Sequence, residues 1–289
     1  MRIVQISDTH LSPTHGFFVG NWRKTVRHVN ALAPDLVVVT GDLTINGPDD
    51  AAELTFARSE LGRLAPRWLA LAGNHDVGDE PPGQDEKQLV DPPRLARWHA
   101  HFGAHYWAET LGSWRLLGLN AQLLGSGLDA ETEQQRWLEE QLGASDSRHI
   151  GLFLHKPLFV ADRDDPASSS CVAPTPRRRL IELFSNAPVR FVANGHLHCH
   201  KQTRLGGLDL IWAPSTAFLA GSQQGHGQEH VVPDSRRELG ILVFDLADEG
   251  YEMRFEPVPQ IETLYLSDIK QGRYRFLRDM PPFQPEGRF

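Results

Sequence analysis

Short runs of apolar residues recur along the first two thirds of the chain, and each run ends in polar residues. The clearest run is Leu36–Asp42, which reads Leu-Val-Val-Val-Thr-Gly-Asp and has no polar alternation. An unbroken β-branched run of this length is typical of a strand that is buried on both faces. We therefore predict a central strand with Asp42 at its carboxyl end.

Four further apolar runs have the same form. A single Asp or His after one strand is more often a loop residue or a helix cap. Five endings together predict a pocket rich in oxygen and nitrogen ligands, because the carboxyl ends of parallel strands gather at one edge of a sheet. The four further apolar runs are Arg2–Ser7 before Asp8 and His10, Trp68–Ala72 before Asn74, His75 and Asp76, Ile150–Leu154 before His155, and Val189–Ala193 before Asn194, His196 and His198.

Helical periodicity separates the first three predicted strands. Residues 21–32 carry apolar side chains at helical spacing behind Asn21, which we predict to be the N-cap. Residues 51–64 repeat the pattern behind Asp50 and Glu53, a predicted capping pair. Strands that are joined by helices are expected to be parallel. Further helices are predicted at residues 95–102 and 129–142 and from Arg177 onward.

The pattern changes beyond His198. Three predicted strands, Leu208–Ala213, Leu239–Leu246 and Tyr251–Val258, follow without long helices between them. We expect them to form a second sheet that is largely antiparallel. The expected fold class is α/β, with one domain over residues 1–258.

Residues 259–289 are expected to form a C-terminal tail. Their apolar content is too high for a free extension, so we predict that the tail packs back on the fold or on a neighbouring subunit, which would give a homo-oligomer. The large side chains are Leu264, Tyr265, Leu266, Tyr274, Phe276, Leu277 and Phe283.

Composition narrows the functional classes. The chain has 29 Lys and Arg against 37 Asp and Glu, a net charge of −8, which gives no general attraction to nucleic acid or to an anionic membrane. Cys171 and Cys199 are too few for a disulfide framework and fit a reducing compartment. No signal-like segment follows Met1, so we expect a cytoplasmic protein without a membrane partner.

Two further histidines and four loops lie outside the five polar endings. His101 and His105 have the spacing of a helical metal pair, but Gly103 interrupts them and we interpret them as surface residues. Loops at residues 11–20, 79–93, 161–176 and 221–237 are expected to form the rim of the pocket and to set specificity.

The five polar endings resemble the motifs of the calcineurin-like metallophosphoesterases. The resemblance covers about the first two thirds of the chain in the family's order. It implies the family's four-layer architecture, a two-sheet mixed β-sandwich flanked by helices. The motifs are Asp8-x-His10, Gly41-Asp42, Gly73-Asn74-His75-Asp76, His155 and Gly195-His196-x-His198.

The resemblance also implies a binuclear metal centre. Two cations that lie close together need a shared anionic ligand, and together they can deprotonate a bridging water and stabilise an in-line phosphoryl displacement. Mn and Fe, alone or together, are the expected ions, with Zn or Mg as alternatives. Asp8, His10 and His198 would hold one ion, Asn74, His155 and His196 would hold the other, and Asp42 would bridge them.

His75 is the expected catalytic residue. It follows a ligand in sequence but is not assigned to a metal in the family's pattern, so the resemblance makes it the donor of a proton or hydrogen bond to the leaving or phosphoryl oxygen. For Asp76 we expect a structural role, or one in orienting His75.

Within the family, the first three motifs look most like the class III cyclic-nucleotide phosphodiesterase and glycerophosphodiesterase branch. A phosphodiesterase acting on small diesters is therefore the first hypothesis, and a phosphomonoesterase or nuclease on the same metals is the second. A binding scaffold without turnover is the third, but such a chain should have lost ligands. No Arg lies within the five motifs, which favours a monoanionic diester, and Lys156 is the nearest basic residue.

Overall fold

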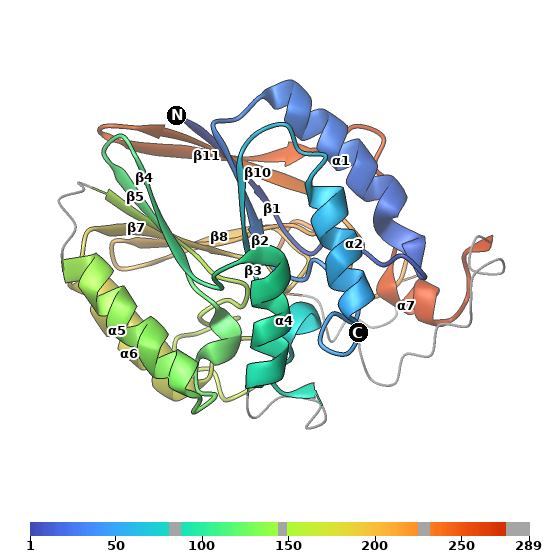
Figure 1. The fold of residues 1–289 in the computed structure, drawn as a ribbon. Coiled ribbons are helices and arrows are strands. Elements are labelled where there is room, and N and C mark those ends of the chain that lie inside the picture. The colour runs from blue at the N-terminus through green and yellow to red at the C-terminus, as the bar shows by residue number, and fades with distance from the viewer. Residues whose placement is uncertain (81–87, 144–148, 225–231, 276–289) are drawn as a thin grey trace.

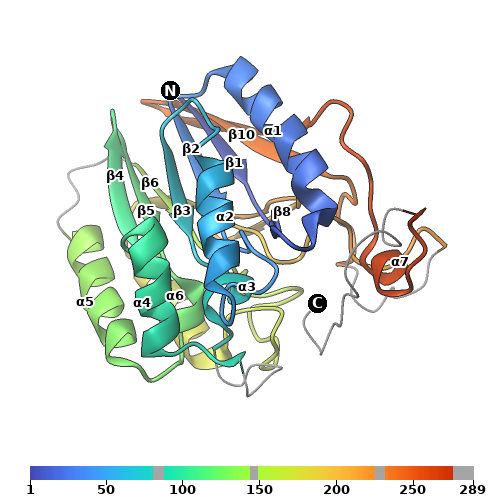
Figure 2. The ribbon, with the colours of Figure 1, turned by 45° about the vertical axis from the view of Figure 1, so that its right-hand side comes forward.

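The computed structural model describes residues 1–80, 88–143, 149–224 and 232–275. Two sheets pack face to face, and helices cover their outer faces (Figure 1 and Figure 2). The strand order is β11-β10-β1-β2-β3 in the first sheet and β4-β5-β6-β7-β9-β8 in the second. The predicted class, a two-sheet mixed α/β sandwich flanked by helices, is confirmed.

The predicted strands and helices lie within a few residues of their expected bounds, whereas β4 and β8 were not predicted. The first sheet consists of β1 (Arg2–Ile6), β2 (Leu36–Thr40), β3 (Trp68–Leu71), β10 (Gly240–Ala247) and β11 (Gly250–Pro257). The second consists of β4 (Trp107–Leu111), β5 (Trp114–Gly118), β6 (His149–Phe153), β7 (Val189–Asn194), β8 (Lys201–Leu205) and β9 (Leu208–Trp212). The helices are α1 (Val19–Leu32), α2 (Ala51–Leu61), α3 (Asn74–Val77), α4 (Pro92–Phe102), α5 (Asp129–Gly143), α6 (Pro174–Ser185) and α7 (Leu266–Lys270), with short 3-10 turns at Gly16–Phe18 and Ala121–Leu123.

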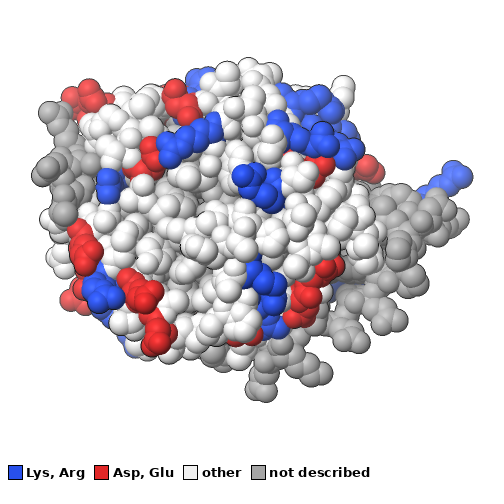
Figure 3. Space-filling view, in the orientation of Figure 1, with Lys and Arg blue, Asp and Glu red and all other residues white. Residues whose placement is uncertain are grey.

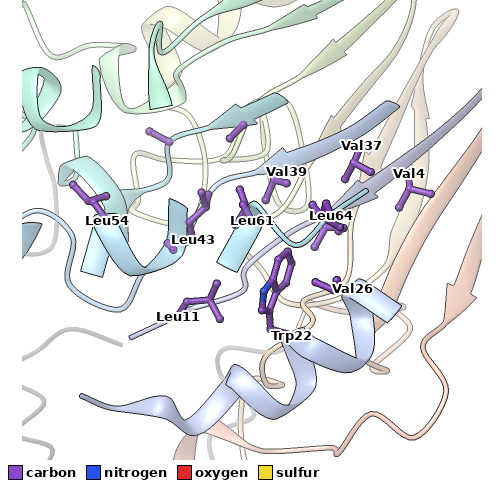
Figure 4. Close-up of a cluster of buried hydrophobic side chains, with 14 of the residues drawn as sticks. Val4, Leu11, Trp22, Val26, Val37, Val39, Leu43, Leu54, Leu61 and Leu64 are labelled. Carbon is purple, nitrogen blue, oxygen red and sulfur yellow. The ribbon is translucent and has the colours of Figure 1, made fainter. Parts of the chain in front are cut away.

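The apolar core is layered in the same way as the backbone. One cluster lies between the first sheet and helices α1, α2 and α4, where Trp22 of α1 faces the strands (Figure 4). A second lies between the two sheets, and a third lies between the second sheet and helices α5 and α6. In β2, Val37 and Val39 belong to the helix-facing cluster, whereas Leu36 and Val38 belong to the inter-sheet cluster. This two-sided burial explains why the run has no polar alternation.

The prediction of a separate antiparallel sheet from the last strands is wrong. β9 pairs in parallel with β7 and extends the second sheet, while β10 pairs antiparallel with β1 and places β1 inside the first sheet. Among the predicted strands, only β10 and β11 pair antiparallel as expected. β9 also forms an antiparallel hairpin, but with β8, which was not predicted. The absence of helices between strands indicates a hairpin, but it does not show which open sheet edge the hairpin will join.

Two helix starts differ from prediction in part. Asn21 is not an N-cap, because α1 begins at Val19 and Asn21 lies in its first turn. Asp50 does cap α2, since its side chain accepts a hydrogen bond from the Ala52 amide. Glu53, however, accepts from the backbone amide of Asn46 and so fixes the preceding loop.

Part of the C-terminal segment packs against the fold. Leu264 and Ile269 are buried in a cluster with Phe17, Phe18 and Phe218. Phe276, Leu277 and Phe283 lie outside the described residues. A domain boundary at residue 258 and a contact with a neighbouring subunit stay predictions.

The surface has mixed charge on the face shown in Figure 3, where Lys and Arg side chains are interspersed with Asp and Glu. In the described part of the chain, none of the helices has the length and apolar character that crossing a membrane requires.

His105, which was interpreted as a surface residue, is instead partly buried. Burial, with a smaller effect of His99, lowers its pKa from 6.5 to about 4. A histidine with a lowered folded pKa binds fewer protons in the folded state than in the unfolded state. Its stabilising effect is therefore fully present above about pH 6.5 and is lost as the pH falls towards 4.

We expect His105→Gln to reduce the loss of stability between pH 6.5 and 4 by about 1–3 kcal/mol. The measurement is the urea-derived free energy of unfolding across this range. His101→Gln, a change of the same kind on the adjoining helix, is the control. Equal pH slopes for the wild type and His105→Gln would show that His105 does not limit acid stability.

Candidate metal centre

All seven predicted ligands lie together, at the carboxyl ends of β1, β2 and β3 in one sheet and of β6 and β7 in the other. Asp8, His10 and His198 each place a ligand atom within 4.8 Å of the others, as do Asp42, His155 and His196. Five of the seven are buried, and Asn74 and His196 are half-buried. We call Asp8, His10 and His198 the β1 group. We call Asp42, His155 and His196, together with Asn74, the β6 group.

The spacing of the donor atoms in the β1 group suits a shared metal ion. His10 Nε2 lies 3.2 Å from His198 Nε2, and His198 Nε2 lies 3.4 Å from Asp8 Oδ1. Ligand atoms that each lie about 2.1 Å from one ion are roughly 3 Å apart, so only small adjustments would be needed.

The β6 group has the same spacing and includes the predicted bridge. His155 Nε2 is 3.2 Å from Asn74 Oδ1, from His196 Nδ1 and from Asp42 Oδ2. Asp42 Oδ2 is also 3.9 Å from His10 Nε2 of the β1 group. The Asp42 carboxylate therefore lies between the two groups, where a ligand common to both ions would have to be.

Most of the ligands sit on an unusual backbone. The φ angles are +54° at Asp8, +44° at His10, +50° at Asp42, +70° at His196 and +51° at His198. Each such conformation costs a non-glycine residue on the order of 1 kcal/mol or more, and it persists only where surrounding contacts fix it. Two of these contacts join the loops after β1 and β2, because the amide of Asp8 donates to the Gly41 carbonyl and that of His10 donates to the Asp42 carbonyl.

Three motif glycines allow the loops to approach the ligands closely. A Cβ atom on Gly73 would lie 2.1 Å from Asp42 Oδ1, and one on Gly41 would lie 2.5 Å from His155 Nδ1. A Cβ on Gly195 would lie 2.6 Å from Asp8 Oδ2. These glycines belong to the sequence motifs, but the motifs alone predict no role for them. They keep side-chain atoms out of the space that the ligands occupy.

Backbone carbonyls orient three of the histidines. His155 Nδ1 contacts the Thr40 carbonyl at 2.8 Å, His196 Nε2 contacts that of Ser169 at 2.9 Å, and His198 Nδ1 contacts that of Phe218 at 2.9 Å. A carbonyl can only accept, so each contacting nitrogen carries the proton and the opposite nitrogen presents its lone pair to the pocket. This is the tautomer that a metal-binding imidazole needs.

The surroundings of His10, His196 and Asp42 favour the protonation states that bind a metal ion. Burial, with the neighbouring histidines, lowers the pKa of His10 and of His196 well below the ordinary range, so both rings are neutral. Burial opposes ionisation of Asp42, but His155 and His75 outweigh it and hold the Asp42 pKa well below its usual value. His155 differs from these groups. Burial opposes its protonation, yet the adjacent Asp42 raises its pKa to about 9, so a proton competes with a metal ion for this ring.

His75 lies beside both groups. Its Nδ1 contacts the Ile45 carbonyl at 2.8 Å, its backbone amide donates to Asp42 Oδ1 at 2.9 Å, and its ring meets that of His10 edge to face at 4.9 Å. Asp76 accepts hydrogen bonds from the amides of Gly73, Leu43 and Thr44. These contacts match the structural role expected for Asp76, which ties the loop after β3 to the loop after β2.

We expect Gly73→Ala to weaken metal binding by at least about 10–100-fold, because its methyl group would displace the Asp42 carboxylate. Metal content after dialysis, measured by elemental analysis, is the readout. Gly207→Ala is the matched control, since a Cβ there meets nothing within 4 Å. If Gly73→Ala retained as much metal as the control, close approach at this glycine would not matter.

Comparisons with known proteins agree with this geometry. Among the relatives is the human serine/threonine-protein phosphatase CPPED1, 27% identical over 246 residues, which cover 79% of this chain and 75% of the relative. A probable cyclic nucleotide phosphodiesterase of Moraxella catarrhalis is 29% identical over 55% of this chain and 58% of its own length. A probable glycerophosphodiester phosphodiesterase, GpdQ of Arcobacter nitrofigilis, is 26% identical over 68% of this chain and 72% of its own length.

Solved structures show the same fold at lower identity. A purple acid phosphatase from yellow lupin superposes with a TM-score of 0.65 at 13% identity, over 99% of this chain and 57% of that one. A dimetal phosphatase from Danio rerio gives 0.61 at 11% identity, over 88% and 95%. The family model described as calcineurin-like phosphoesterase matches residues 1–200. The chain belongs to the calcineurin-like phosphoesterase family and is a hydrolase of phosphoric esters.

Proposed function

We propose that the protein is a binuclear metal-dependent phosphodiesterase that hydrolyses small diesters of the cyclic nucleotide or glycerophosphodiester type. The position of Asp42 carries the proposal. One carboxylate oxygen lies 3.9 Å from a nitrogen of the β1 group and 3.2 Å from a nitrogen of the β6 group. A shared anion between two sets of ligands suits two adjacent cations better than one.

The protein's own residues would have distinct tasks. When bound, two metal ions would supply Lewis acidity, which polarises the phosphoryl group and makes water a nucleophile near neutral pH. The β1 and β6 groups would hold these ions, with Asp42 of the β6 group shared between them. Because neither group contains a cysteine, the ligands suit Mn or Fe, with Zn or Mg as alternatives. His75, anchored by the Ile45 carbonyl, would donate a proton or hydrogen bond to the leaving oxygen.

The nearby cations support a diester substrate. Lys156 is fully buried and pairs with Asp79 and with Glu80, the latter at 2.8 Å. Arg177 is also fully buried, with Nε and Nη1 donating to backbone carbonyls, and Arg179 pairs with α5. The basic residues that the sequence puts nearest to the ligands therefore have partners elsewhere. A monoanionic diester needs less neutralisation from such groups than a dianionic monoester does.

The names of the relatives support two candidates. The Moraxella and Arcobacter relatives are named as phosphodiesterases, which favours the proposal. The relatives named CPPED1 are serine/threonine-protein phosphatases, and the human one matches more of the chain, 79% against 55% for the Moraxella protein. A phosphomonoesterase on the same metals is therefore the second candidate.

Substrate preference separates the two candidates. With the same metal and pH, we expect kcat/KM to be higher for bis-nitrophenyl phosphate than for mono-nitrophenyl phosphate. The natural-type pair, a glycerophosphodiester and glycerol phosphate, should follow the same order. A clear preference for the monoesters would exclude the diesterase assignment and leave the two-metal hydrolase assignment standing.

His75→Ala should lower kcat on natural-type diesters by about 10²–10⁴-fold while the metal content stays at the wild-type value. The loss should be smaller on nitrophenyl esters, because nitrophenolate leaves without protonation. His101→Ala serves as the control. Equal losses on both ester classes would show that His75 positions the phosphoryl group and does not protonate the leaving oxygen.

A further inference from the structure

Residues 215–221 touch the β1 group and no other part of the predicted ligand set in the described contacts. Ser215 Oγ donates to the Asp8 carbonyl at 2.9 Å, and the Phe218 carbonyl receives the Nδ1 proton of His198 at 2.9 Å. The Phe218 ring lies 4.2 Å from the His198 ring and 4.9 Å from the His10 ring, measured between centroids. This segment therefore contacts all three ligands of the β1 group and holds them in position.

The C-terminal residues hold this segment in turn. The Leu219 amide donates to the Leu264 carbonyl at 2.8 Å, and the Leu266 amide donates to the Leu219 carbonyl at 3.0 Å. The Ser267 amide donates to the Gly221 carbonyl at 3.0 Å. Because Leu264 is buried against Phe218, the contact combines a short backbone ladder with apolar packing.

Asn21 joins both segments to α1. Its Nδ2 donates to the Glu262 carbonyl at 2.8 Å and to the Ala217 carbonyl at 3.3 Å, and its Oδ1 accepts from the Glu262 amide at 2.9 Å. The side chain is 3% exposed. Only an amide can make this set, since a carboxylate in its place would face two carbonyl oxygens without a proton to donate.

We propose that Asn21 and residues 262–268 are positioning elements that set the metal affinity of the β1 group alone. The β6 group has separate supports, in the carbonyls of Thr40 and Ser169. The inference rests on the proposed function, because it requires that the two groups hold metal ions. Residues 215–221 and 262–268 both lie beyond the span matched by the family model, so they are features of this chain outside the shared motifs.

The test is Asn21→Asp in three backgrounds: wild type, His196→Ala and His10→Ala. Each full-length apoprotein is titrated with Mn²⁺ by calorimetry. In the wild type, one of the two binding events should weaken by about 10–100-fold. In His196→Ala, where the β1 group remains, the same weakening should appear. In His10→Ala, where the β6 group remains, Asn21→Asp should leave the Mn²⁺ affinity unchanged.

Asn30→Asp is the matched control. Asn30 lies on the same helix and also bridges backbone groups, the Arg63 carbonyl and the Ala65 amide, far from the ligands. It should leave Mn²⁺ binding unchanged in all three backgrounds. Thermal unfolding establishes that each variant is folded, and Asn21→Ser replaces Asn21→Asp if the latter is not.

The outcomes are distinguishable. Equal weakening in the His196→Ala and His10→Ala backgrounds, or no weakening in either, would overturn the positioning role while leaving the two-metal centre intact. If His10→Ala and His196→Ala each still bound two Mn²⁺ ions, the assignment of ligands would fail, and the positioning role would fail with it.

Discussion

The candidate site depends on how closely the loops after β2, β3 and β7 approach ligand side chains that neighbouring loops carry. Gly41, Gly73 and Gly195 leave less room beside the ligands than a single methyl group needs. This tight approach lets ligands from two sheets converge on a space a few ångströms wide. It also explains the left-handed backbone at Asp8 and Asp42, since the chain must turn sharply at the strand end to point a short side chain back at its neighbours.

The sequence was most informative where local pattern and position coincide. The strand β2 is buried on both faces, so its residues form an unbroken apolar run, and Asp42 follows within two residues of the strand end. A residue that directly follows a strand of a parallel sheet lies at the carboxyl edge of that sheet, where the ends of the neighbouring strands also lie. For this reason the strand ends predicted a set of candidate ligands. The resemblance of the motifs then selected seven of them and divided these between two ions.

Other features could not be predicted because they depend on backbone groups or on tertiary pairing. The Thr40, Ser169 and Phe218 carbonyls orient three histidines, yet a carbonyl is present at every residue and leaves no mark in a sequence. Asn21 matches a helix cap in its local context, but its amide is used by residues that are remote in sequence. The partner of β10 was likewise set by the open edge of β1, which no local pattern records.

The pairing of β1 with β10 has a consequence for how the chain is made. Residues 2–5 lie opposite residues 242–245, so one edge of β1 has no partner until most of the polypeptide has been synthesised. β1 contains the apolar residues Ile3, Val4 and Ile6, and an unpaired strand edge is a site at which a growing chain can associate wrongly. The loop that carries Asp8 and His10 follows this strand directly. The strand that carries this loop therefore gains its second neighbour only after residues 242–245 have been synthesised.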